Sequence, residues 1–323
     1  MKVGSSGLTF HVVDGWEQLP DDYSHRDVSG VAVDSTDRVY VFNRSEHPVQ
    51  VHEPNGAFLG SWGEGIFTNP HGIRIANDVV YCVDDFDHTL RKFTLEGELL
   101  QVWGSPGVPS DTGATGDDYR SIRHAGPPFN RPTNAAVAPS GAVYVTDGYG
   151  NARVHRFSST GDLELSWGDP GKGPGQFNVP HSVAIASNER ILVADRENSR
   201  IQVFDSNGGF QEEWADLARP DDIAVDAAGN VYVAELGPAG PYAFQAPFPP
   251  DFPPSRVSIF DSTGSLLARW GTLDSCAPGS FFAAHGLCLD SVGDLYVGEV
   301  SWSAGGDAAP VGCHTLQKFQ RTD

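Results

Sequence analysis

A repeated unit runs through almost the whole chain and limits what the chain can fold into. Six segments share one pattern, in which two alternating apolar runs are joined by a short turn. Most units continue with a third alternating run and with a fourth that ends in Trp-Gly, as in LELSWG. Period-two alternation, β-branched residues and turns of Asp, Ser, Asn and Gly are typical of short antiparallel strands. The six segments are SGVAVDSTDRVYVFNR, HGIRIANDVVYCVDD, TNAAVAPSGAVYVTDGY, HSVAIASNERILVADRE, DDIAVDAAGNVYVAEL and HGLCLDSVGDLYVGEV.

One unit has a single apolar face and is too small to fold alone, so the units must stack on one another. A ring of six stacks them without leaving a long free edge. We therefore predict an all-β fold, a six-bladed β-propeller. The sixth unit lacks a fourth strand, whereas LTFHVVDGW at residues 8–16 has the outer-strand pattern. The N-terminal strand is thus predicted to pair with the last blade and close the ring.

The predicted fold is a single domain over residues 8–320, with three insertions at residues 104–131, 236–255 and 300–314. In a propeller all three insertions fall on the face where the inner strands begin. Long loops on one face of a rigid scaffold usually build a cleft or lid, although surface decoration is the alternative. The blades are expected at about 28–63, 70–104, 132–168, 180–215, 220–271 and 284–320, with the closing strand at 8–16.

The charge balance excludes some partners. The 323 residues include 21 basic and 42 acidic ones, and the net charge of -21 repels nucleic acid and anionic membrane surfaces. No apolar run approaches the roughly 18 residues of a membrane span, and no basic-then-apolar leader is visible. We expect a soluble, cytoplasmic protein without nucleic-acid or membrane partners, and we predict no particular oligomeric state.

The four cysteines show no metal-binding spacing. Cys82 and Cys288 lie within strand-like apolar runs, where a buried free thiol is expected. No disulfide is expected for them or for Cys276 and Cys313.

Histidine recurs at one position of the repeat. Aligning the first strands gives a column in which units two, four and six carry His71, His181 and His285. Inner strands line the channel of a propeller, so three imidazoles at one height on alternate blades would converge on its axis. Such a tripod can hold a divalent metal and leave a position open, whereas the alternative is three unrelated histidines at strand starts. Zinc fits best, with iron, manganese or copper left open. The other column members are Ser29, Thr133 and Asp221.

Three residues in the loops between second and third strands should lie near the same mouth. They are Arg44 in FNRSEH, Tyr149 in TDGYGNAR and Arg196 in ADRENSR. An arginine there could hold a substrate carboxylate, and a tyrosine beside a cation could act as a base. Each residue alone could equally be a structural hydrogen bonder.

Residues 28–319 resemble the peptidyl-α-hydroxyglycine α-amidating lyase family, a branch of the NHL-repeat propellers. The resemblance rests on NPHGI, TDGYGNARV, PGQFNVPHSVAI, VADRENSRIQVF and FNRSEH. It implies cleavage of the N–C bond of a carbinolamide, which gives an amide and an aldehyde acid such as glyoxylate. It also implies a Zn²⁺ ion on the three column histidines, Tyr149 as the base, and Arg44 with Arg196 nearby holding the carboxylate and the developing oxyanion.

Two departures limit what the resemblance implies. Gly286 stands where the family has an acidic ligand of a structural Ca²⁺ ion, which puts that ion in doubt. The insertions at 104–131 and 236–255 suggest a substrate other than a peptide C-terminus, such as a small α-hydroxy amide or a ureido-hydroxy acid. Two other functions stay open. One is a metal-dependent hydrolase or lactonase on the same scaffold, and the other is a docking propeller, for which three converging histidines have no use.

Overall fold

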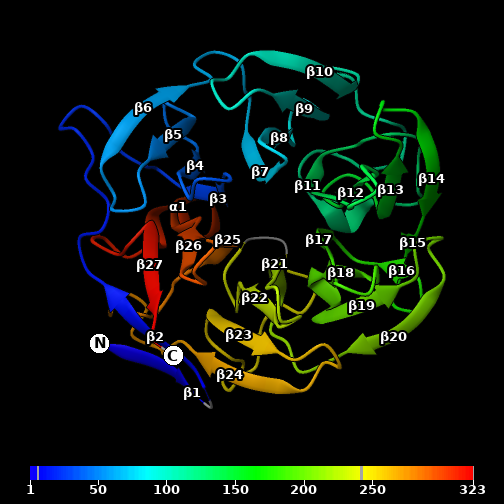
Figure 1. The fold of residues 1–323 in the computed structure, drawn as a ribbon. Coiled ribbons are helices and arrows are strands. Elements are labelled where there is room, and N and C mark those ends of the chain that lie inside the picture. The colour runs from blue at the N-terminus through cyan, green and yellow to red at the C-terminus, as the bar shows by residue number, and fades with distance from the viewer. Residues whose placement is uncertain (6, 241–242, 323) are drawn as a thin grey trace.

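The protein, seen here in a computed structural model, is a ring of blades around a central axis (Figure 1). The structure describes residues 1–5, 7–240 and 243–322. Five blades are four-stranded antiparallel sheets whose strands follow one another outward, and the sixth has five strands. The predicted six-bladed propeller is confirmed. Among the described residues no helix is long and apolar enough to cross a membrane.

The strand boundaries repeat closely from blade to blade. A short parallel pair, β15 (Asp169–Pro170) and β16 (Gln176–Phe177), and a five-residue helix, α1 (Ser301–Gly305), lie outside the blades. Listed from the inner strand outward, the blades are β3 to β6 (Val28–Val33, Val39–Asn43, Val49–His52, Phe58–Trp62), β7 to β10 (Pro70–Ala76, Val79–Asp84, Thr89–Phe93, Leu99–Gly104), β11 to β14 (Pro132–Val137, Val143–Asp147, Arg153–Phe157, Leu163–Trp167), β17 to β20 (Pro180–Ile185, Ile191–Asp195, Arg200–Phe204, Phe210–Trp214), β21 to β24 (Pro220–Val225, Val231–Glu235, Arg256–Phe260, Leu266–Trp270), and β25, β26, β27, β2 and β1 (Ala284–Leu289, Leu295–Glu299, Leu316–Arg321, Leu8–Val13, Lys2–Ser5).

The N-terminal strand closes the ring, as the sequence predicts. β2 pairs antiparallel with β27, with Phe10 opposite Arg321 and Val13 opposite Lys318. β1 then adds a fifth strand outside β2, so the sheet begins at Lys2, before the predicted start at residue 8. Phe10 has no exposed surface and packs on Trp270 of the preceding blade, with ring centroids 5.5 Å apart. The closing strand therefore joins its own blade and also bridges to the neighbouring one.

Acidic residues at the ends of the second strands fix where the inner strands begin. The carboxylate of Asp195 accepts a hydrogen bond from the amide of Asn178, just before β17. Asp147 binds the amide of Asn130 in the same way before β11. Charge-assisted bonds to backbone amides are stronger than neutral ones, so five of the blades hold the start of the inner strand in this way, whereas β4 of the first blade ends at Asn43. Equivalent carboxylates are Asp84, Glu235 and Glu299.

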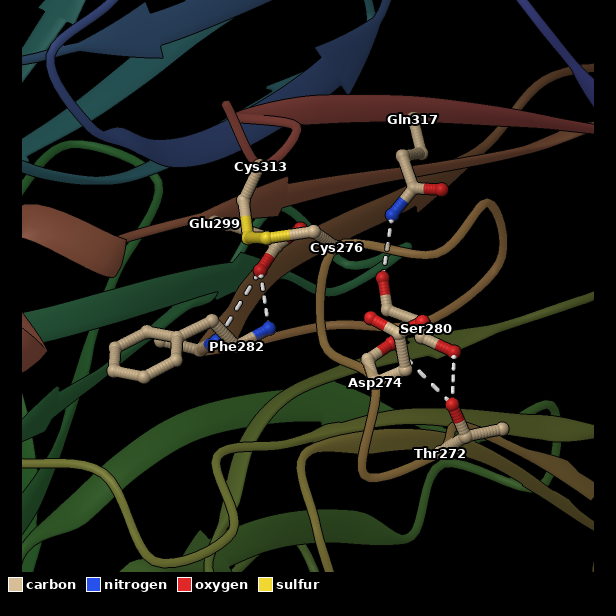
Figure 2. Close-up of a disulfide and its surroundings, with 9 residues drawn as sticks. Thr272, Asp274, Cys276, Ser280, Phe282, Glu299, Cys313 and Gln317 are labelled. Carbon is tan, nitrogen blue, oxygen red and sulfur yellow. Dashed lines mark hydrogen bonds between the residues drawn. A yellow bond between two sulfur atoms is a disulfide. The ribbon is translucent and has the colours of Figure 1, made fainter. Parts of the chain in front are cut away.

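The expectation that no disulfide forms is wrong. Cys276 and Cys313 are bonded, with their Cα atoms 4.4 Å apart (Figure 2). The bond joins the loop between β24 and β25 to the end of the 300–314 insertion, just before β27 of the sixth blade. Disulfides persist mainly in oxidising compartments, whereas the cytoplasm keeps thiols reduced, so this bond does not favour the expected cytoplasmic location. Cys82 and Cys288 are free and buried, as expected.

Deleting residues 1–16 should destabilise the whole protein, because it exposes the edge of β27 and the surface that Phe10 covers. Phe10→Ala alone should cost about 3–5 kcal/mol, which lowers Tm by roughly 10 °C in a protein of this size. Thermal unfolding followed by circular dichroism measures both variants. His11→Ala, which changes an exposed residue on the same strand, should melt like the parent protein. A deletion variant with unchanged Tm would contradict this role of β2.

Candidate functional site

A one-residue shift in strand register at each column position directs the side chain of that residue toward the central channel. In the fourth blade Pro180 pairs with Asp195 and Ser182 with Ala194, so His181 between them is a bulged residue without a cross-strand partner. β-Bulges occur next to active sites because they redirect a side chain. The same shift occurs at His71 and His285 and at the other three column positions, which lie between Val28 and Gly30, between Pro132 and Asn134, and between Pro220 and Asp222.

The backbone before three of these bulges is strained. Arg131, Val179 and Arg219 each precede the proline that begins an inner strand, and their φ angles are 63°, 61° and 59°. A left-handed conformation is costly for a residue with a Cβ atom, above all for a β-branched one such as Val179. Strain of this kind persists where the surrounding structure enforces it, and here it marks the mouth of the channel.

The three histidines meet at the axis. Their ring centroids are 4.8 to 4.9 Å apart, and one nitrogen from each lies within 4.8 Å of the others. Each Nδ1 atom lies 2.6 to 2.7 Å from the carbonyl oxygen of the column residue in the next blade. The carbonyl can only accept, so Nδ1 carries the hydrogen and Nε2 keeps a free lone pair. The acceptors are Thr133 for His71, Asp221 for His181 and Ser29 for His285.

These imidazoles are suited to bind a metal ion. Burial lowers the pKa of all three well below the ordinary value, so the rings are neutral near pH 7. Neutral imidazole is the form that binds metals, and a hydrogen bond from its other nitrogen to a carbonyl is the usual second contact of a metal-binding histidine. The three buried histidines therefore form a potential metal site.

Tyr149 lies directly beside the tripod. Its phenol oxygen is 3.1 Å from Nε2 of His71 and 2.9 Å from Nε2 of His181. Both nitrogens are acceptors, and one phenol hydrogen can serve only one of them. Nη1 of Arg196 donates to the same phenol oxygen at 3.1 Å. Burial raises the pKa of Tyr149, while the positive charge of Arg196 acts in the opposite direction.

Arg44 approaches from the first blade. Its Nε atom donates to the carbonyl of Pro70, next to His71, and Nη1 donates to Oγ of Ser303 at 2.7 Å. Asp27 holds that serine and the start of α1, since its carboxylate accepts the amide of Trp302 at 2.9 Å. The third insertion is thus fixed to the first blade beside the site.

Arg44, Tyr149 and Arg196 occupy equivalent places in their blades, since each follows a second strand. The amide of Arg196 donates to the carbonyl of Val179, and that of Tyr149 to the carbonyl of Arg131. Together with His285 they border a cavity of about 250 Å³. Residues from all three insertions complete its wall. The lining residues are Arg44, Asn69, Asp85, Phe86, Asp117, Tyr119, Arg131, Tyr149, Arg196, Arg219, Asp221, Leu236, Gly240, His285, Val300, Ser303 and Ala304.

Sequence reasoning missed several charged residues of this cavity. The repeat alignment gives Asp221 only a place in the column, yet its Oδ1 atom lies 3.4 Å from Nη1 of Arg196 and 3.5 Å from Nδ1 of His181. Burial raises its pKa to about 7. Arg131 bonds Asp85 at 2.9 Å, and Arg219 is completely buried. The repeat could have identified Asp85 and Arg219, because they stand at the same two blade positions as Arg196 and Val179.

The residues present do not fit a calcium ion beside Gly286. A Cβ atom at Gly286 would lie 2.6 Å from Cα of Gly30, so an acidic side chain has no room there. In the channel Arg74 forms an ion pair with Asp222, and the same carboxylate accepts from Asn134 and Ser182. The Arg74 guanidinium and the other donors already satisfy this carboxylate, which makes it a poor ligand for a cation.

Comparisons with known proteins agree with this geometry. The NHL repeat profile matches residues 129–157 and 177–204. The probable peptidyl-alpha-hydroxyglycine alpha-amidating lyase pgal-1 of Caenorhabditis elegans is 30% identical over 232 residues, which cover 63% of this chain and 61% of that protein. Over this region the chain is similar to an amidating lyase. Human NHL repeat-containing protein 3 is 34% identical over 213 residues, 62% of this chain and 57% of that protein. The chain thus spans about three-fifths of the length of each of these relatives.

Solved structures show the same fold at lower identity. A Xanthomonas campestris protein described as a gluconolactonase, XC5397, has a TM-score of 0.61 at 16% identity, over 93% of this chain and 88% of that chain. At this identity the likeness extends to the fold alone.

Purified protein should contain about one divalent transition metal ion per chain, and His181→Ala should remove it, since two imidazoles bind such an ion much more weakly than three. Elemental analysis after dialysis measures the metal content. His124→Ala, at an exposed histidine of the first insertion, should leave the content unchanged. Parent protein that takes up no metal even after incubation with zinc, iron, manganese or copper would contradict the site.

Proposed function

We propose that the protein is a zinc-dependent lyase that cleaves the N–C bond of a small α-hydroxy amide and releases an amide and an aldehyde acid such as glyoxylate. The observation that supports this best is the cluster of three buried, neutral imidazoles in contact with Tyr149, whose phenol oxygen is bonded by Arg196. The relationship to the amidating lyases supports the reaction type. Three converging histidines argue against a propeller that serves only for docking.

The proposed reaction needs no second reactant. Tyr149 must first be deprotonated, and as the phenolate it takes the proton of the substrate hydroxyl. The electron pair of that O–H bond forms a carbonyl group, and the C–N bond breaks. The nitrogen leaves with the bonding pair and receives the proton back from Tyr149, so atoms and electrons balance. When bound, a zinc ion supplies positive charge that lowers the pKa of nearby hydroxyl groups.

Two arginines are placed to bind the carboxylate of the substrate. Arg196 is buried and bonded to the base, and Arg44 borders the same cavity from the opposite blade. A guanidinium binds a carboxylate through two parallel hydrogen bonds and so orients the carbon between the carboxylate and the hydroxyl. We assign Arg44 and Arg196 to the substrate carboxylate and to the negative charge that develops on the oxygen.

Tyr149→Phe should keep the metal and lose turnover of α-hydroxyhippurate by about a hundredfold or more, since general-base catalysis contributes 10²–10⁴-fold. Glyoxylate release, measured with the metal content, tests this. Tyr144→Phe, at a buried tyrosine on the opposite face, should retain activity. Retained turnover in Tyr149→Phe would assign the base elsewhere. Hydrolysis of a lactone without any aldehyde acid from the amide would favour the hydrolase instead.

The substrate should be small, because 250 Å³ lies below the usual range of ligand pockets. We expect kcat/KM for α-hydroxyhippurate to exceed that for a tetrapeptide ending in α-hydroxyglycine by about tenfold or more, because the peptide must displace the insertions. Tyr119→Ala, which removes a ring from the wall, should narrow that ratio. Equal kcat/KM values for both substrates in the parent protein would contradict the small-substrate assignment.

A further inference from the structure

Glu197 lies directly behind Arg196 and is completely buried. Its Oε1 atom accepts from Nε of Arg196 at 3.0 Å and from Nη2 of Arg219 at 2.7 Å. Burial alone would raise the pKa of this carboxyl, but the two guanidinium groups lower it below the ordinary value. The carboxylate is therefore ionised and shared between an arginine of the proposed site and one behind it.

The same glutamate holds the second insertion. Its Oε2 atom accepts from the amide of Phe244 at 2.9 Å, and its backbone carbonyl accepts from the side chain of Gln245 at 3.1 Å. Arg219 in turn donates to the carbonyl of Gly237 at 3.0 Å. The described parts of the 236–255 insertion are thus bonded to the glutamate and to its arginine partner.

The first insertion reaches the same carboxylate. The hydroxyl of Tyr119 donates to Oε1 of Glu197 at 3.5 Å. The Tyr119 ring stacks between Tyr149 and Phe244, with centroid distances of 6.2 and 5.8 Å and interplanar angles of 24° and 10°. The guanidinium of Arg196 lies 5.5 Å from the centre of the same ring. One carboxylate therefore contacts the proposed substrate arginine and both insertions.

We infer that Glu197 is a positioning residue. It fixes the guanidinium of Arg196 and the two insertions relative to one another, so that the cavity closes only when Arg196 is oriented to bind the substrate carboxylate. The inference rests on the proposed function only in that Arg196 is taken to meet the substrate. The competing reading is that Glu197 merely neutralises buried Arg219. In that case loss of the Glu197 carboxylate would lower the stability of the protein without changing the orientation of the Arg196 guanidinium.

Glu197→Gln keeps the shape of the side chain and removes its charge. We expect kcat/KM for α-hydroxyhippurate to fall about ten- to a hundredfold, the range for losing a charge-assisted hydrogen bond. Hydrogen exchange in the segment that contains the Phe244 amide should become faster, while the metal content stays unchanged. Glu164→Gln, at an exposed glutamate paired with Arg156, is the matched control and should change neither measurement.

A double-mutant cycle separates positioning from bulk stability. If Glu197 acts through Arg196, then Glu197→Gln should cause little further loss of kcat/KM in an Arg196→Gln background. Additive losses, or faster exchange at Phe244 with unchanged kcat/KM, would overturn the inference. If Glu197→Gln does not fold, Gln245→Ala tests the inference instead, because it removes only the hydrogen bonds from Gln245 to the Glu197 carbonyl and to Ser199. In Gln245→Ala, a loss of kcat/KM smaller than the one expected for Glu197→Gln, together with faster hydrogen exchange at the Phe244 amide, would support the inference. Values equal to those of the parent protein would overturn it.

The outcomes also distinguish this inference from the proposed function. A parent protein that releases no glyoxylate would sink the proposed lyase. Exchange at Phe244 and the affinity for glyoxylate, compared between the parent and Glu197→Gln, would then decide whether Glu197 links the insertions to Arg196. Turnover by the parent with no effect of Glu197→Gln on either measurement would leave the lyase standing and reject the link.

Discussion

The hydrogen bond from each channel histidine to a carbonyl of the next blade is the contact on which the site depends. Each bond fixes the ring and its tautomer and leaves Nε2 free toward the axis. Because the acceptor belongs to the neighbouring blade, the tripod is a property of the whole ring. The bond from His285 to Ser29 joins the inner strand of the sixth blade to that of the first. The tripod therefore needs the last blade of the chain to pack against the first.

Around this centre the protein buries an unusual set of charges for an acidic chain. Arg196, Arg219, Glu197 and Asp221 are all buried near one cavity. Isolated buried ions are very costly, so each must be paired and hydrogen-bonded. The second insertion takes part in this pairing, because the carbonyl of Gly237 bonds Arg219 and the amide of Phe244 bonds Glu197. The insertion thereby covers the charged groups that it bonds. The cover and the charges thus stabilise each other, and the cavity they leave is small.

The relationship to the amidating lyases and the geometry support the same reaction type from independent directions. The segments that match the NHL repeat carry Tyr149, His181 and Arg196, whereas the insertions add part of the cavity wall. On the proposed function, the scaffold would position the reacting groups, and the loops on one face would set what can reach them.

The sequence by itself determined the repeat, the closing strand and the histidine column. Strand alternation and turn residues are local signals, and six copies of them reinforce one another. The alignment of repeats also indicated Tyr149, Arg44 and Arg196, because equivalent positions in a ring lie at equivalent places. Only the tertiary structure decided the Cys276–Cys313 pairing, the bulge that turns each column residue inward, and the contacts of Glu197. The pairing and the contacts of Glu197 involve loops without periodicity, whose partners only folding brings within bonding distance. The bulge repeats in every blade, but strand alternation alone does not show a one-residue shift in register.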